Sequence, residues 1–178
     1  MRVVFERYEP RRYRSLVYRD DGVVLVLPGY DRKWRVPHDL AHFATERELR
    51  LTDGVWGSIA AGGVFANMQV VAGRKRHDAR QRSERVLKAN SRSLAIAEVL
   101  AGVVHDAVEH RDRRELYQRA CGAWGVLHEE PFPFPAHALT AAADTLEELA
   151  ARWTGRTLEV EWGQPPRAMR RTSRASSS

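Results

Sequence analysis

The first part of the chain alternates between apolar and polar positions, the pattern of β-strands with one buried face. Strands are expected over residues 2–8, 14–19 and 23–27. Asp20-Asp21-Gly22 predicts a tight turn between the second and third strands, because glycine adopts positive φ at no steric cost. Together these segments predict an antiparallel meander.

The periodicity then changes to that of helices. Pro37 predicts a helix start, since proline suits the first helical position, and Thr52-Asp53-Gly54 predicts its end after about Leu51. Residues 55–66 are apolar all round and predict a buried helix. Residues 74–90 are strongly charged and fit either a loop or a solvated helix.

The second half of the chain predicts two longer helices and a strand. Apolar positions recur at helical spacing after Ser91 or Ser93 and again over 137–153. Residues 116–127 fit a short helix or a turn region. Residues 157–162 alternate strictly and predict a last strand, which joins the meander either at an edge or between strands.

These elements predict one α+β domain over residues 1–163. A small antiparallel sheet, made of the N-terminal meander and the C-terminal strand, packs against four to five helices. With 178 residues, 43% of them hydrophobic, the chain is large enough for one real core. Residues 164–178 are rich in Ser and Arg and are expected to form a disordered basic tail.

The location of the protein follows from what the sequence lacks. No run approaches the roughly 18 apolar residues of a membrane helix, and charges interrupt the N-terminal apolar stretch, unlike in a secretory signal. Cys121 is the single cysteine, so no internal disulfide can form. We expect a soluble cytoplasmic protein with no membrane partner.

The formal net charge of +6 is concentrated in two places. The tail carries four arginines, and residues 74–92 carry eight Lys or Arg against Asp78 and Glu84. Such a block can contact phosphate backbones, but it has no interleaved aromatic residues for base stacking. A solvated face is therefore favoured over nucleic-acid binding.

One cluster carries recognisable chemistry. At about 100° per residue, His38, His42 and Glu46 share one side of the predicted helix, and apolar residues such as Leu40 lie opposite. The histidines are therefore expected to face solvent or a cleft rather than the core. Two imidazoles at i and i+4 converge on one ion, as in the His-Glu-x-x-His zinc helix. Here the acid is Asp39, which could orient an imidazole, act as a base or serve the helix dipole.

The third metal ligand is open at this stage. Glu46 is a candidate for a ligand or a supporting residue, although it lies about 12 Å along the helix from His38. Glu98 and His105 share one side of a later helix, which could place them opposite the two histidines if the helices pack together. The other candidates are His77, Glu109 and His110. The competing interpretation is an ordinary solvated helix face.

Two resemblances bear on this cluster. The stretch Val36-Pro37-His38-Asp39-Leu40-Ala41-His42-Phe43, with Glu46, Gly54-Val55-Trp56-Gly57 and Ala60-Ala61-Gly62-Gly63, resembles a family of small, uncharacterised actinobacterial proteins over about the first 70 residues. The His38-Asp39-x-x-His42 pattern is also similar to the zinc motif of a ubiquinone-biosynthesis family, sometimes called the coenzyme Q assembly factor. That family has Glu at the position of Gly54. The second resemblance implies a metal.

We therefore expect a metal-binding protein, specifically a metal-dependent hydrolase or oxygenase. His38, His42 and Glu46 are the predicted metal ligands and Asp39 the predicted catalytic residue. The cofactor is a divalent ion, with zinc favoured and iron or manganese also fitting this donor set. The alternative is a non-enzymatic module that contacts nucleic acid or a protein partner through residues 74–92. The sequence indicates neither a particular small-molecule substrate nor an oligomeric state.

Overall fold

A five-stranded antiparallel sheet and six helices make up the part of the chain that the structure, a computed structural model, describes: residues 1–9, 12–29, 35–74, 77–153 and 155–163. The strands are β1 (Arg2–Glu9), β2 (Arg12–Tyr18), β3 (Val24–Pro28), β4 (Gln69–Ala72) and β5 (Thr157–Glu161). Their order in the sheet is β4-β3-β2-β1-β5. The predicted last strand therefore joins the meander at its edge, beside β1.

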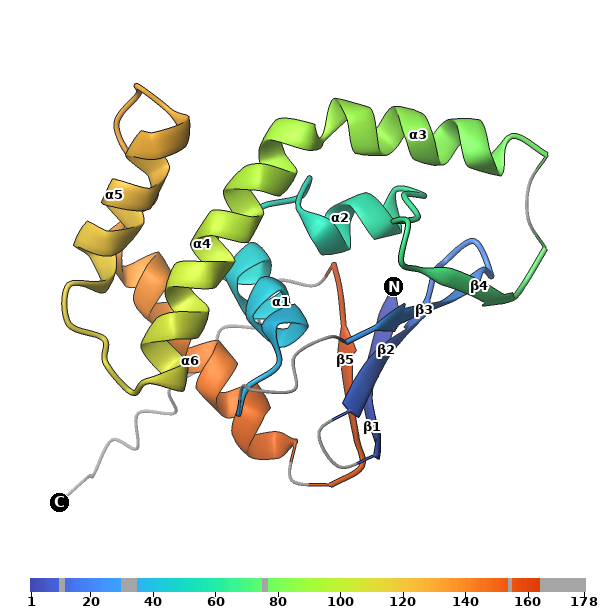
Figure 1. The fold of residues 1–178 in the computed structure, drawn as a ribbon, viewed down its shortest axis with the longest axis horizontal. Helices are drawn as coiled ribbons and strands as arrows, with labels where there is room; N and C mark the ends of the chain where they lie inside the picture. Colours follow the sequence, from blue (N-terminus) through green and yellow to red (C-terminus); the bar gives the residue numbers. More distant parts are fainter. Residues whose placement is uncertain (10–11, 30–34, 75–76, 154, 164–178) are drawn as a thin grey trace, which may run out of the picture.

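The helices gather on one side of this sheet (Figure 1). They are α1 (His38–Glu48), α2 (Val55–Ala60), α3 (Ala79–Ala89), α4 (Ser91–Glu109), α5 (Leu116–Leu127) and α6 (Ala136–Arg152). α1 is central and packs against both α4 and α6, while α5 packs on α4. This arrangement encloses α1, whose residues 40–46 are all buried.

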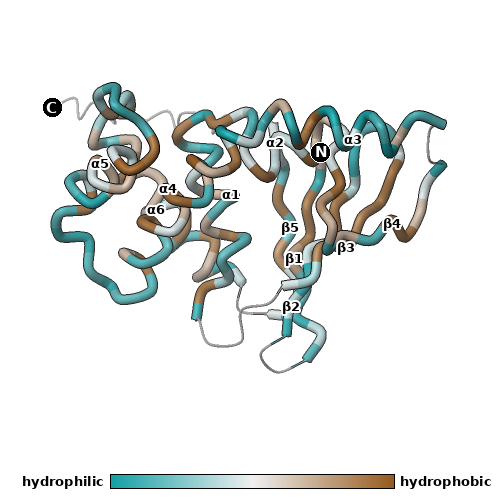
Figure 2. The backbone as a smooth tube through the Cα atoms, turned by 45° about the horizontal axis from the view of Figure 1, so that its top comes forward, coloured by the Kyte–Doolittle hydropathy of each residue, from teal (hydrophilic) through white to brown (hydrophobic). Residues whose placement is uncertain are grey.

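The core lies between the sheet and this helical layer. Alternate residues of each central strand are buried, so the apolar positions of the meander face the helices. Figure 2 shows hydrophobic positions, in brown, recurring along these strands. Phe5 on β1 stands at the centre, with its ring centroid 6.2 Å from that of Phe43 on α1 and 5.7 Å from that of Trp56 on α2. These edge-to-face contacts attach the site-bearing helices to the sheet.

The structure confirms the α+β class, with more helices than expected because residues 79–89 form α3. The buried helix expected over 55–66 is shorter than predicted, since α2 ends at Ala60 and Gly62 follows with a φ of 110°. β4 was not predicted, because its four residues carry no clear alternation. The tail predicted over 164–178 lies outside the described residues. No helix in the described ranges has the length and apolar character needed to cross a membrane.

α1 ends earlier than the sequence pattern predicts. The helix stops at Glu48, and Arg50 adopts a φ of 56°, the left-handed conformation common just after helix ends. The N–H of Leu51 then donates to the carbonyl of Glu46 at 2.8 Å, which satisfies a carbonyl near the helix end. The chain reverses here and leads into α2 beside the polar face of α1.

Replacing Phe5 by Ala should destabilise the protein by about 3–5 kcal/mol, because it removes a fully buried ring between sheet and helices. The free energy of unfolding in urea measures this change. Val126→Ala is the control, since Val126 is 83% exposed and its truncation should alter stability by no more than about 0.5 kcal/mol. Similar losses in both variants would contradict this assignment of the core.

Candidate metal centre

The start of α1 is fixed by a contact with α4. Glu109, near the end of α4, accepts hydrogen bonds from the backbone N–H of Arg35 at 2.9 Å and of Val36 at 3.0 Å. Pro37 then precedes the first helical residue, His38. Glu109 thus has a positional role at the beginning of the helix and does not join the histidine cluster described below.

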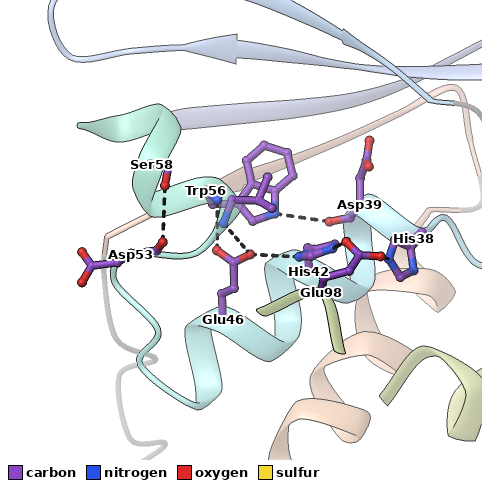
Figure 3. A network of polar contacts seen from close by, with 9 residues as sticks. His38, Asp39, His42, Glu46, Asp53, Trp56, Ser58 and Glu98 are labelled. Atoms are coloured by element: carbon purple, nitrogen blue, oxygen red, sulfur yellow. Dashed lines mark hydrogen bonds and ion pairs between the residues drawn. The ribbon is translucent and has the colours of Figure 1, made fainter. Parts of the chain in front are cut away.

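Glu98 of α4 lies between the two histidines of α1 (Figure 3). Its Oε1 is 3.2 Å from Nε2 of His38, and its Oε2 is 3.0 Å from Nε2 of His42. One ligand atom from each of these three residues lies within 4.8 Å of the other two. The packing of α4 on α1 therefore brings together two imidazoles and one carboxylate that could hold a metal ion.

Glu46 occupies the opposite side of His42. Its Oε1 accepts a hydrogen bond from Nδ1–H of His42 at 3.0 Å, and from the backbone N–H of Val55 at 2.9 Å. Its Oε2 accepts from the backbone N–H of Trp56 at 3.0 Å. The carboxylate is thus fully buried and bonded to the first turn of α2. This geometry favours the supporting role for Glu46, one of the two roles that the sequence allowed.

Gly54 makes room for this carboxylate. A Cβ atom at position 54 would lie 2.4 Å from Cδ of Glu46, closer than real atoms pack. The position where the ubiquinone-biosynthesis motif has Glu is therefore filled here by a glycine that lies against the carboxylate of Glu46. A side chain at 54 would displace that carboxylate from His42.

His105 of α4 contacts Nδ1 of His38, as Glu46 contacts Nδ1 of His42. Nε2 of His105 lies 2.7 Å from the carbonyl oxygen of Val36, so Nε2 carries the proton and donates it. In a neutral ring Nδ1 is then an acceptor, and it lies 3.5 Å from Nδ1 of His38. Nδ1–H of His38 can therefore donate to His105, which would leave Nε2, the nitrogen that faces Glu98, available to a metal ion.

Asp39 points away from this cluster. Its Oδ2 lies 3.4 Å from Oγ of Ser15 on β2, so the carboxylate is on the sheet side of α1. The backbone carbonyl of Asp39 accepts a hydrogen bond from the indole N–H of Trp56 at 3.3 Å. Of the three roles that the sequence allowed, this placement in the first turn favours interaction with the helix dipole. The catalytic assignment stays a prediction.

The remaining candidate ligands lie elsewhere. His110 is exposed, and its Nδ1 lies 2.9 Å from a carboxylate oxygen of Asp106. His77 is exposed in the turn that precedes α3. Of the alternatives that the sequence offered, Glu98 belongs to the three-residue group and His105 to its surroundings.

The expectation that both histidines face solvent or a cleft is wrong for His42, which is only 4% exposed. The helical spacing separates the polar from the apolar positions of α1. The polar side is nevertheless buried, because α4 packs against it. His38 keeps 26% of its side-chain surface exposed, and Glu98 keeps 64%. The cluster is thus buried on one side and open to water on the other.

The electrostatics of the cluster favour an imidazolium at His42 when no metal is bound. Burial alone would lower the pKa of His42, but the hydrogen bonds to Glu46 and Glu98, with their negative charges, raise it to about 9. The same contacts, from His38 and His42, hold the pKa of Glu98 well below its usual range. A proton on Nε2 of His42 then lies between the imidazole and Glu98.

Comparison of the chain with models of known protein families, with curated proteins and with solved structures found no match. Both resemblances noted from the sequence therefore stay predictions. The geometry of the cluster is therefore the basis for inferring a function.

The stability of the metal-free protein should fall as pH rises from about 6.5 to about 9. The pKa of His42 is raised to about 9 in the folded state, so protonated His42 stabilises the fold fully below its unfolded pKa of about 6.5 and loses this contribution as pH passes the folded value. Urea unfolding in the presence of a chelator measures the effect. The decline should be absent in His42→Gln and unchanged in His110→Gln, and a flat profile for the native chain would contradict it.

Proposed function

We propose that this protein binds a divalent metal ion through Nε2 of His38, Nε2 of His42 and the carboxylate of Glu98, and that it is a metal-dependent enzyme. The observation that supports this most is the orientation of the two rings. Both present Nε2 to the same carboxylate, while each Nδ1 faces a separate partner. Glu98 replaces Glu46 as the proposed third ligand.

The partners at Nδ1 are those expected around a metal site. Histidine ligands usually donate their second ring N–H to a carboxylate or another acceptor, which fixes the tautomer and makes the ligating nitrogen more basic. Glu46 provides such an acceptor for His42, and His105 provides one for His38.

Metal binding would replace a proton. In the metal-free state Nε2–H of His42 donates to Glu98, and a cation between the two groups would take over the same charge-balancing role. Affinity should therefore weaken as pH falls, because the proton competes with the metal.

The exposure of the cluster favours a catalytic over a purely structural ion. Structural zinc sites are closed by four protein ligands, whereas catalytic sites use three and leave a position for water or substrate. Here three ligands are available and Glu98 is 64% exposed, so such a position would be open to solvent. Zinc bound in this way supplies an activated water for hydrolysis, and iron or manganese with two His and one carboxylate supports oxygen chemistry. Zinc is the ion we favour.

Untagged protein should contain about one metal ion per chain by elemental analysis. His38→Ala and Glu98→Gln should each reduce this content strongly, because two protein ligands do not retain the ion against a chelator. His110→Ala, which removes an exposed imidazole at the end of α4, is the matched control and should keep full occupancy. Metal-free native protein that also fails to take up added zinc would refute the proposal.

Replacing Glu46 by Gln should lower zinc affinity about 10–100-fold, the effect typical of losing the group that orients a histidine ligand. Competition with a chromogenic chelator measures it. Gly54→Ala should act in the same direction, since its Cβ would push the carboxylate of Glu46 away from His42. If both variants lose stability but keep native zinc affinity, Glu46 has a structural role alone.

A further inference from the structure

A row of three cations lies on the outer face of α3 and the beginning of α4. It consists of Arg85, Lys88 and Arg92, all exposed, and we call it the basic face. The i, i+3 spacing places Arg85 and Lys88 on one side of α3, and Arg92 follows in the first turn of α4, beyond the bend at Asn90 (Figure 1). Asn90 joins the two helices: its N–H donates to the carbonyl of Val86 in α3, and its carbonyl accepts from the N–H of Leu94 in α4.

Two of the three cations of the basic face are not neutralised by the described part of the chain. Neither Arg85 nor Lys88 has an ion pair within the part of the chain that the structure describes. Arg92 is partly balanced: it donates to Nδ1 of His128 at 2.7 Å, and its charge, after the contacts within residues 128–130, helps to lower the pKa of the nearby Glu130. Glu84 is the acid on α3, and Arg80 pairs with it at 2.9 Å. Cations elsewhere are more often matched, as Arg113 is by Asp144 and Glu147 on α6.

α3 is held at the periphery of the molecule. It runs along one border of the structure, drawn largely in hydrophilic colours in Figure 2. Ser83 is its one buried residue, and its hydroxyl bonds to the backbone of Val64. A helix that contributes so little to the core and carries unpaired cations is suited to contact something outside the chain.

We propose that the basic face binds the phosphate backbone of duplex nucleic acid without reading its base sequence. Arg85 and Lys88 are about 4.5 Å apart along α3, with Arg92 in the first turn of α4, and a duplex presents phosphates at about one per 1.7 Å. Cationic side chains at this spacing can therefore meet successive phosphates. The surface is distinct from the proposed metal ligands, and this inference does not depend on metal binding.

Other polyanions fit the basic face less well. A helix that lies on a membrane needs large apolar side chains directed outward, but Leu87 of α3 is directed inward, 3.1 Å from where a Cβ of Gly63 would be. Single-stranded nucleic acid is held by bases stacked on aromatic rings. Residues 73–92 contain no Phe, Tyr or Trp. Backbone contact with a duplex requires neither feature.

The basic face is separate from the metal centre. Arg92 and Glu98 belong to the same helix, but six residues turn a helix by about 240°, so their side chains leave different sides of α4. The binding test below is made with metal-free protein, so its outcome is separate from that of the metal proposal.

Binding of the full chain to a short, labelled, random-sequence duplex can be followed by fluorescence anisotropy at several salt concentrations. The test variant combines Arg85→Gln, Lys88→Gln and Arg92→Gln, which keep good helix formers in place. Affinity should fall on the order of tenfold or more, and each lost phosphate contact should reduce the slope of log affinity against log salt by about 0.9. Far-ultraviolet circular dichroism verifies that the variant is folded.

The matched control combines Arg50→Gln, Arg111→Gln and Arg156→Gln, three exposed arginines outside residues 74–92. It removes the same charge and leaves the basic tail intact, so it should bind the duplex nearly as tightly as the native chain. Equal losses in both triple variants would overturn the proposal, since net charge alone would then drive binding. It would also be overturned if the basic-face variant lost affinity for phosphatidylserine vesicles or single-stranded DNA but not for the duplex.

Discussion

The buried carboxylate of Glu46 is the constraint on which the arrangement of the centre depends. A charged group without exposure is tolerated only when its oxygens are satisfied, because burial of an unpaired carboxylate is very costly. Here two backbone N–H groups of α2 and one imidazole meet that requirement. The same contacts hold α2 against α1 and set the ring of His42, so local electrostatics and helix packing cannot be separated at this point.

The sheet and the helices supply the rigid frame for this arrangement. Phe5 touches aromatic rings from both α1 and α2, so these two helices share one anchor on β1. α4 then closes the polar side of α1 and contributes Glu98 and His105 together. Packing of two helices, more than the properties of either one, therefore brings two imidazoles and a carboxylate within reach of one another.

The local sequence pattern predicts part of the fold and part of the candidate site. The meander, the start of α1 and the shared side of His38 and His42 follow from spacing and turn residues. The choice between Glu46 and Glu98 does not, because it depends on how α1 and α4 pack and on where the N–H groups of α2 lie. Gly54 could have indicated the role of Glu46, because a glycine allows another group to approach the backbone closely. The sequence does not show that this group is the carboxylate of Glu46, since that depends on the fold.

The pairing of β1 with β5 has a consequence for how the chain folds. Arg2 lies opposite Glu161, so the central β1 gains one of its two neighbours from the far end of the described chain. Such long-range closure costs chain entropy before any contact repays it, and it slows folding relative to local helix formation. Until β5 pairs with β1, one border of β1 presents unpaired backbone groups, and this edge is where intermolecular strand pairing can occur during folding.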